Sequence, residues 1–69
     1  MMWYEKLHDA RVQKGLSQRE LGELAGIHFV QVCRIERGQQ IPNALTLFKL
    51  CYALNLSMDW IFAGGVKLL

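Results

Sequence analysis

Residues 18–37 constrain the fold most, because they combine two short helical patterns with a glycine turn between them. Apolar side chains recur at helical spacing on both sides of the turn: Leu21, Leu24, Ala25, Val32 and Ile35. Spacings of three and four residues place apolar side chains on one face of an amphipathic helix. The sequence therefore predicts two short amphipathic helices in close succession.

The first helix of this pair has clear boundary signals. Ser17 precedes it and Glu20 follows three residues later, which is a capping box that satisfies two backbone N–H groups at the helix start. Gly26 can adopt the left-handed conformation that ends a helix and turns the chain. Gly22 inside the helix should cost about 1 kcal/mol relative to alanine, which makes sense if the second helix crosses it at close range.

With its flanking residues, this helix pair resembles the helix-turn-helix of the phage repressor and Cro type, the XRE family. The resemblance rests on residues 15–18, 20–21 and 34–38, then on Pro42, 46–47, 49–50, 53–54, Ser57, Asp59 and Ile61. It covers residues 7–62, with the helix-turn-helix at 18–37. It implies an all-α, lambda-repressor-like fold of five helices that binds double-stranded DNA.

Helices are expected at residues 3–14, 17–25 and 28–37, from 42–43 onward, and at 58–62. Asn43 and Ser57 are suitable N-caps for the last two. The inner faces should carry the core residues Trp3, Leu7, Ala10, Leu21, Ala25, Val32, Ile35, Leu47, Leu50, Cys51, Leu54 and Ile61.

Arg11 lies on or near the inner face of the first helix, where a solvated surface arginine is the simplest interpretation. The resemblance instead implies an ion pair between Arg11 and Glu36, at the end of the recognition helix. If that pair is partly buried, loss of one partner leaves an unpaired charge, at a cost of about 3–5 kcal/mol.

The resemblance also assigns residues 28–37 to the DNA-reading helix and implies that Phe29, Val30 and Arg34 face the bases. Relatives usually carry polar residues at the first two positions. Phe29 and Val30 could pack on thymine methyl groups, and Arg34 could bind guanine, which is worth about 1–3 kcal/mol of discrimination. The alternatives are that Phe29 packs the helix start against the core and that Arg34 contacts phosphate alone.

Further candidate DNA contacts surround these positions: Gln18, Arg19, His28, Gln31, Cys33, Arg37 and Gln40. Gln18 stands in a first helical turn, which favours anions, and the resemblance implies a bond to phosphate; a neutral helix-start residue is the alternative. His28 is interpreted as a helix-start residue, because no second metal ligand stands nearby. Cys33 is interpreted as a small contact, with a redox switch as the alternative.

The net charge of +2 is mild for a nucleic-acid binder, so the distribution of charge matters more than its sum. Arg19, Arg34 and Arg37 lie within the motif. The following loop contains Gln39 and Gln40, where relatives often carry lysine or arginine. We therefore expect modest affinity and a shallow salt dependence of DNA binding.

Large apolar residues also stand near the end of the chain, at Trp60, Phe62 and Val66. A contiguous apolar patch on so small a protein usually marks a partner surface, and the resemblance implies a homodimer interface here. A homodimer would place two recognition helices about 34 Å apart, in successive major grooves.

Length and composition bear on the number of domains and on whether the protein is a membrane protein, a metalloprotein or an enzyme. The 69 residues predict a single domain spanning 1–69, and no apolar run approaches the ~20 residues of a membrane span, which favours the cytoplasm. Cys33 and Cys51 lack metal-ligand spacing and are expected to be free thiols. No cofactor or metal is expected. No nucleophile–base spacing or phosphate loop indicates an enzyme.

The leading hypothesis is a homodimeric, sequence-specific regulator of transcription, a repressor or autoregulator, that binds a near-palindromic operator in double-stranded DNA. The alternative is a protein-interaction module of the same fold, similar to an antitoxin, with a protein partner and little DNA affinity. The apolar Phe29 and Val30 and the low charge favour this alternative. Binding of duplex DNA at low salt separates the two hypotheses.

Overall fold

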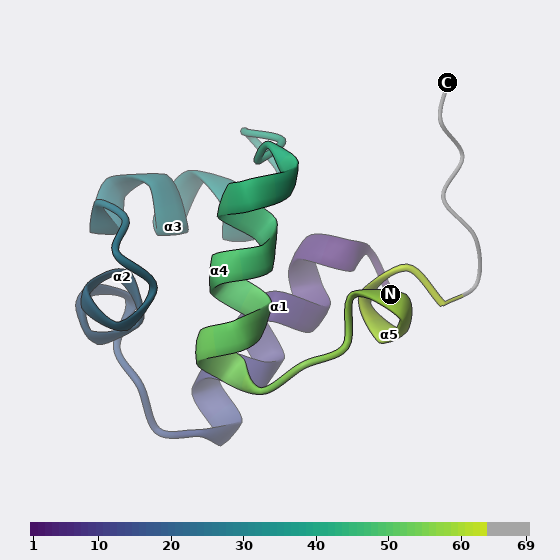
Figure 1. Ribbon diagram of the computed structural model, residues 1–69, viewed down its shortest axis with the longest axis horizontal. Helices are drawn as coiled ribbons and strands as arrows, with labels where there is room; N and C mark the ends of the chain where they lie inside the picture. Colours follow the sequence, from purple (N-terminus) through teal and green to yellow (C-terminus); the bar gives the residue numbers. More distant parts are fainter. Residues whose placement is uncertain (64–69) are drawn as a thin grey trace.

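The computed structural model describes residues 1–63, which form five α-helices without a strand. They are α1 (Trp3–Gln13), α2 (Gln18–Ala25), α3 (Phe29–Glu36), α4 (Ala44–Leu54) and α5 (Met58–Ile61) (Figure 1). The prediction of an all-α fold with five helices is confirmed. The predicted bounds were one or two residues too wide, because several of the terminal residues, such as Ser17 and His28, are extended N-caps.

The helices pack so that α3 lies along one edge of the bundle. In Figure 1, α4 crosses the centre of the view with α1 behind it, α2 and α3 lie on one side, and α5 on the other. Helix α2 packs against α3 and α4, whereas α1 contacts α3, α4 and α5. Across residues 1–63, none of these helices combines the length and apolarity needed to cross a membrane.

Every helix contributes to one hydrophobic core. Its buried members are Leu7, Ala10, Leu21, Ala25, Val32, Ile35, Leu47, Leu50, Cys51, Leu54 and Ile61. All of them were predicted from the spacing. Trp3, also predicted to face inward, is half-buried and packs against this core.

Leu24 departs from the apolar pattern that it shares with Leu21 and Ala25, since 63% of its surface is exposed. The buried stripe of α2 consists of Leu21, Gly22 and Ala25. With about 100° between successive residues, Leu24 lies roughly a quarter turn from the centre of that stripe. Gly22, rather than Leu24, therefore faces the neighbouring helix.

Hydrogen bonds from backbone N–H groups to side-chain oxygens define the helix starts as predicted. Ser17 Oγ accepts from the Glu20 backbone N–H at 3.0 Å, and the Glu20 carboxylate accepts from the Ser17 N–H at 2.9 Å. The hydrogen bond from the Ser17 backbone N–H, and secondly the Ser17 side chain, lower the pKa of Glu20 because they favour the charged form of its carboxylate. Asn43 Oδ1 accepts from the Thr46 backbone N–H and caps α4, and Ser57 Oγ accepts from the Asp59 backbone N–H and caps α5.

The turn between α2 and α3 depends on two glycines. Gly26 has a φ of 72°, in the left-handed region, and ends α2 as predicted. A Cβ atom on Gly22 would lie 2.7 Å from the carbonyl oxygen of Ile27 and 3.3 Å from the backbone nitrogen of Phe29. The close crossing inferred from the sequence is therefore present, and it brings the start of α3 directly onto α2.

Candidate nucleic-acid interface

The ten residues predicted to contact DNA come from the start of α2, from α3 with its caps, and from the loop that follows α3. Four of them are exposed: Arg19, His28, Arg34 and Arg37. The other six are half-buried: Gln18, Phe29, Val30, Gln31, Cys33 and Gln40. Because Val32 and Ile35 fix the inner side of α3 in the core, Arg34 and Arg37 are left at the surface near its C-terminal end.

The start of α3 is capped by a histidine. The Nδ1 atom of His28 accepts a hydrogen bond from the Val30 backbone N–H at 3.2 Å, so the neutral ring carries its proton on Nε2. The ring also stacks on that of Phe29, with centroids 5.0 Å apart. The interpretation of His28 as a helix-start residue is confirmed.

Phe29 also contacts α2. The guanidinium carbon of Arg19 lies 4.1 Å from the centroid of the Phe29 ring, which is the distance of a cation–π interaction. The Phe29 ring thus stacks on His28 and lies against Arg19. Phe29 is not among the half-buried residues that pack against the core. This geometry holds a positive charge at the corner where α2 meets α3.

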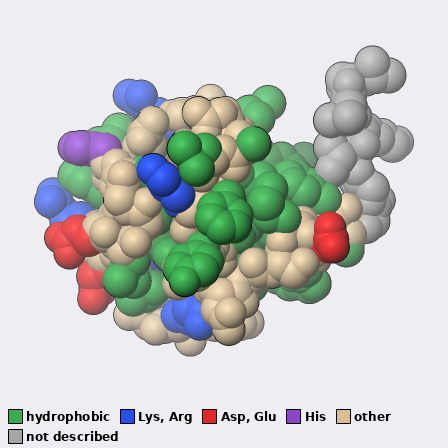
Figure 2. Space-filling model, viewed as in Figure 1, with side chains coloured by type: hydrophobic (Ala, Val, Ile, Leu, Met, Phe, Trp, Pro, Cys, Tyr) green, Lys and Arg blue, Asp and Glu red, His purple; other side chains and the backbone are tan. Residues whose placement is uncertain are grey.

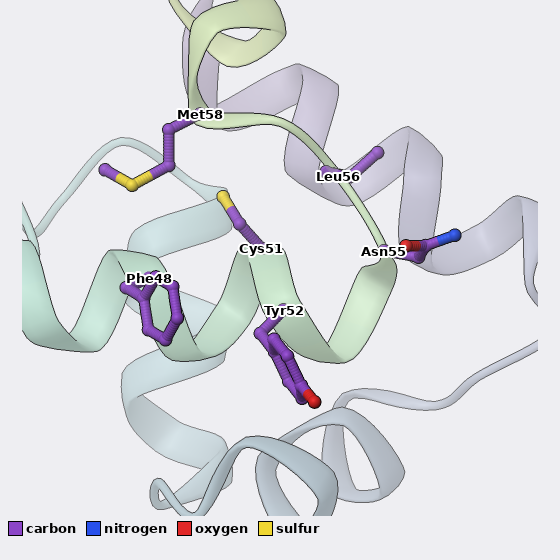
Figure 3. A pocket seen from close by; sticks show the side chains of 6 residues that line it. All are labelled: Phe48, Cys51, Tyr52, Asn55, Leu56 and Met58. Atoms are coloured by element: carbon purple, nitrogen blue, oxygen red, sulfur yellow. The ribbon is translucent and has the colours of Figure 1, made fainter.

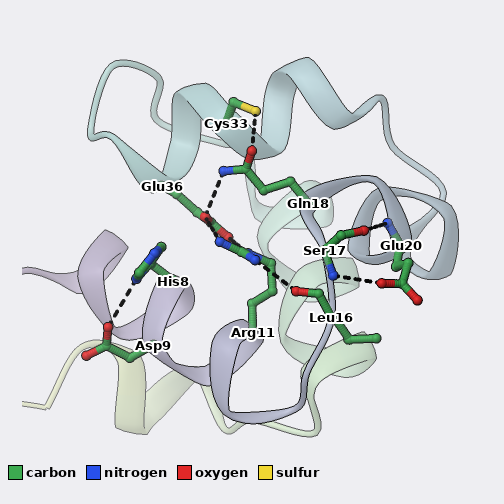
Figure 4. Close-up of polar contacts among 9 residues, drawn as sticks. All are labelled: His8, Asp9, Arg11, Leu16, Ser17, Gln18, Glu20, Cys33 and Glu36. Atoms are coloured by element: carbon green, nitrogen blue, oxygen red, sulfur yellow. Dashed lines mark hydrogen bonds and ion pairs between the residues drawn. The ribbon is translucent and has the colours of Figure 1, made fainter.

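Behind this surface, Arg11 and Glu36 form a buried ion pair (Figure 4). Arg11 Nε donates to Glu36 Oε2 at 2.8 Å, and Arg11 Nη2 donates to Glu36 Oε1 at 3.0 Å. The two side chains are only 11% and 4% exposed. Arg11 Nη1 also donates to the carbonyl oxygen of Leu16 at 2.8 Å, so the pair ties α1 to α3 and to the segment before α2.

Gln18 extends this network toward the candidate DNA surface, a feature that the sequence analysis missed. Its Nε2 donates to Glu36 Oε1 at 3.1 Å, and the Cys33 thiol donates to its Oε1 at 2.7 Å (Figure 4). Cys33 and Glu36 are three residues apart and share a face of α3. That spacing was the available sequence signal.

A second surface, also missed, is the outer face of α4, defined here as Leu45, Phe48 and Tyr52. These side chains are 62%, 53% and 78% exposed, and Figure 2 shows hydrophobic side chains gathered in front of α4. Beside them is an open hollow of about 540 Å³ (Figure 3), lined by Phe48, Cys51, Tyr52, Asn55, Leu56 and Met58.

The predicted dimer residues near the end of the chain lie in different environments. Trp60 is 47% exposed, and Lys6 is held beside it because its ammonium donates to the carbonyl oxygens of Trp60 and Ala63 at 3.0 and 3.2 Å. Phe62 is half-buried and packs against the core. Val66 lies outside the described residues.

Cys33 and Cys51 are free thiols, and burial raises the pKa of Cys51. No group of three or more histidine, cysteine or acidic side chains in this part of the chain is placed to hold a metal ion.

Two helices joined by a tight glycine turn, with the second helix exposing arginines at the edge of a five-helix bundle, define the helix-turn-helix class. The chain belongs to this family: the model described as Helix-turn-helix, HTH_3, matches residues 7–61. The resemblance to the XRE type is thereby confirmed.

Curated relatives of the chain are named as transcriptional regulators. YgzD of Bacillus subtilis (strain 168), an HTH-type transcriptional regulator, is 35% identical over 83% of this chain and 86% of its own length. The HTH-type transcriptional regulator PuuR of Escherichia coli (strain K12) is 35% identical over 91% of this chain. The match covers only 34% of PuuR, so this chain spans about a third of that protein.

Two solved structures share the fold and a detectable sequence similarity. The restriction-modification controller protein C.AhdI from Aeromonas hydrophila has a TM-score of 0.83 and 33% identity, covering 87% of this chain and 91% of that one. The P22 c2 repressor, solved with a synthetic operator, has a TM-score of 0.86 and 28% identity, covering 93% and 97%. By name, the first is a controller protein of restriction-modification and the second is a repressor.

Proposed function

We propose that this protein is a sequence-specific regulator of transcription, a repressor or autoregulator, that inserts α3 into the major groove of double-stranded DNA. The observation that carries this proposal is the two-sidedness of α3. Val32 and Ile35 are buried on one side, while Arg34 and Arg37 are exposed. The operator complex of the P22 c2 repressor, which shares the fold, supports the same assignment.

In this proposal the residues of the motif have different roles. Arg34 donates to the two acceptors of guanine, O6 and N7, and Val30 packs on a thymine methyl group. Phe29 acts mainly as the platform that holds Arg19 toward the DNA backbone. Phosphate contacts come from Gln18 and Arg19 and from the remaining candidates His28, Gln31, Arg37 and Gln40.

The protein acts as a homodimer on a near-palindromic operator in this account. Support comes from the large apolar side chains that residues 1–63 leave exposed, since such surface on a small protein usually marks an interface. The interface includes Trp60 and Phe62, as predicted from the sequence, and the outer face of α4 is a second candidate. The free thiols suit a reducing compartment such as the cytoplasm.

A footprinting experiment on the duplex upstream of the protein's own gene tests this function. We expect two protected half-sites with centres one helical turn apart, because two-fold symmetry of the protein is mirrored in its operator. A single protected half-site would contradict the dimer. Lack of protection at low salt, together with recovery of a stable protein complex, would favour the interaction-module alternative.

A further inference from the structure

The Gln18 side chain stands between the buried ion pair and Cys33, and both of its polar atoms are engaged. Glu36 Oε1 accepts from Gln18 Nε2 at 3.1 Å, and the Cys33 thiol donates to Gln18 Oε1 at 2.7 Å (Figure 4). The inference drawn from this arrangement rests on the proposed function, in which Gln18 contacts a DNA phosphate.

The chemistry of the two neighbours fixes the direction of the amide. An ionised carboxylate accepts hydrogen bonds and cannot donate them, so the amide nitrogen must face Glu36. Glu36 is itself held by two hydrogen bonds from Arg11 and is 8% exposed. The oxygen of the amide must then face Cys33, and a thiol can donate to it.

This arrangement leaves one hydrogen of Gln18 Nε2 for an outside acceptor. A primary amide has two N–H donors, and Glu36 Oε1 takes one of them. A phosphate oxygen is a suitable acceptor for the second, whereas an amide turned by 180° would present its oxygen to Glu36 and be repelled. The orientation of Gln18 thus decides whether it can bind phosphate without rearrangement.

We infer that Cys33 is a positioning residue for DNA binding: its thiol, together with Glu36, holds the Gln18 amide in the orientation that offers an Nε2 hydrogen to a phosphate oxygen. Cys33 then acts through Gln18 and not by reading a base. Without the thiol donor, only the hydrogen bond to Glu36 holds the Gln18 amide. The amide is then more mobile in the free protein, and ordering it on DNA binding costs part of the affinity.

A double-mutant cycle on the duplex upstream of the gene tests this inference, with wild type, Cys33→Ala, Gln18→Ala and the double variant compared by fluorescence anisotropy. We expect Cys33→Ala to weaken binding about fivefold, which corresponds to one neutral hydrogen bond. In the Gln18→Ala background the same change should have no further effect. Cys33→Ser, which keeps a donor, should recover most of the affinity.

A second readout needs no DNA and separates positioning from general loss of structure. In free protein, the order parameter of the Gln18 side-chain amide nitrogen should fall in Cys33→Ala and stay high in Cys33→Ser, with similar urea midpoints. An unchanged order parameter, or an equal effect of Cys33→Ala with and without Gln18, would overturn the inference. If wild type binds no duplex, the proposed function fails, and the relaxation measurement still decides whether Cys33 fixes Gln18.

Discussion

The α2–α3 motif and the outer face of α4 are both surfaces, but they are built in opposite ways. In the motif, hydrogen bonds hold the polar side chains in place. They include the capping box of Ser17 and Glu20 and the hydrogen-bond network of Arg11, Glu36, Gln18 and Cys33. Recognition by such a surface depends on groups already held in place, because little freedom remains to be lost on binding.

Within residues 1–63, no comparable hydrogen-bond network joins the side chains on the outer face of α4. Leu45, Phe48 and Tyr52 are more than half exposed, and the ring centroids of Phe48 and Tyr52 lie 6.0 Å apart. A surface of this kind gains free energy by removing apolar area from water. Substitutions in the motif should therefore affect folding or DNA binding, whereas substitutions on α4 should affect association.

The largest expected effect is the loss of folding stability when the buried Arg11–Glu36 ion pair is broken. Arg11→Ala leaves the Glu36 carboxylate buried without its partner, and we expect the free energy of unfolding to fall by about 3–5 kcal/mol. Urea denaturation followed by circular dichroism measures it. Arg37→Ala, at an exposed arginine, is the control and should change stability by less than about 0.5 kcal/mol. A loss below about 1 kcal/mol for Arg11→Ala would show that the motif does not depend on this pair.

The next effect is on sequence discrimination. Arg34→Ala should reduce the preference for the upstream duplex over a scrambled one about ten- to hundredfold, because a guanine contact is lost. Arg37→Ala should weaken both complexes similarly and make the salt dependence shallower. Titrations of both duplexes by fluorescence anisotropy distinguish the two arginines, and equal behaviour of the two variants would remove Arg34 from base recognition.

A smaller change in folding stability is expected where α3 crosses α2 at Gly22. Whether that change is a gain or a loss shows how closely the two helices are held together. Gly22→Ala should gain about 1 kcal/mol in helix propensity, but the new Cβ would lie 2.7 Å from the Ile27 carbonyl oxygen. We expect the contact to dominate, so that the urea midpoint falls. Leu24→Ala, on the exposed side of the same helix, should leave it nearly unchanged. A raised midpoint for Gly22→Ala would mean that α3 can move away from α2.

The smallest effect on folding is expected on α4. Phe48→Ser should change the stability of the dilute protein by less than about 0.5 kcal/mol, since its side chain is half exposed. Sedimentation velocity over a range of concentrations should nevertheless show weaker dimerisation if α4 forms the interface. Trp60→Ser is the matched variant for the terminal site. Whichever substitution produces monomers identifies the interface, and a monomeric wild type would contradict both.

Much of the fold could be predicted from the sequence, because helix caps and buried helix faces depend on residues only three or four positions apart. A few neighbouring residues were enough to predict the cap formed by Ser17 and Glu20 and the helix end at Gly26. The same holds for the helical spacing of apolar residues from Leu47 to Leu54. Leu24 was misleading because α2 is short and Gly22 contributes no apolar side chain to reveal the true stripe. On α4, spacing placed Leu47, Leu50, Cys51 and Leu54 in the core, but it did not show that the apolar Phe48 and Tyr52 form an exposed surface on the other side.

The candidate site was less predictable, because its contacts join side chains on different helices. Helical spacing puts Cys33 and Glu36 on one face of α3, but it predicts neither the bonds of Gln18 to these two residues nor the contact of Arg19 with Phe29. They depend on how closely α3 crosses α2, which only the folded chain defines.

Whether α3 reads DNA sequence can be decided by one titration. Fluorescence anisotropy would compare the upstream duplex of the gene with a scrambled duplex at about 50 and 200 mM salt, a range in which phosphate-driven binding weakens steeply. The account predicts that the upstream duplex binds about a hundredfold more tightly or better, and that both complexes weaken with salt. Absence of binding to either duplex at 50 mM salt would contradict it.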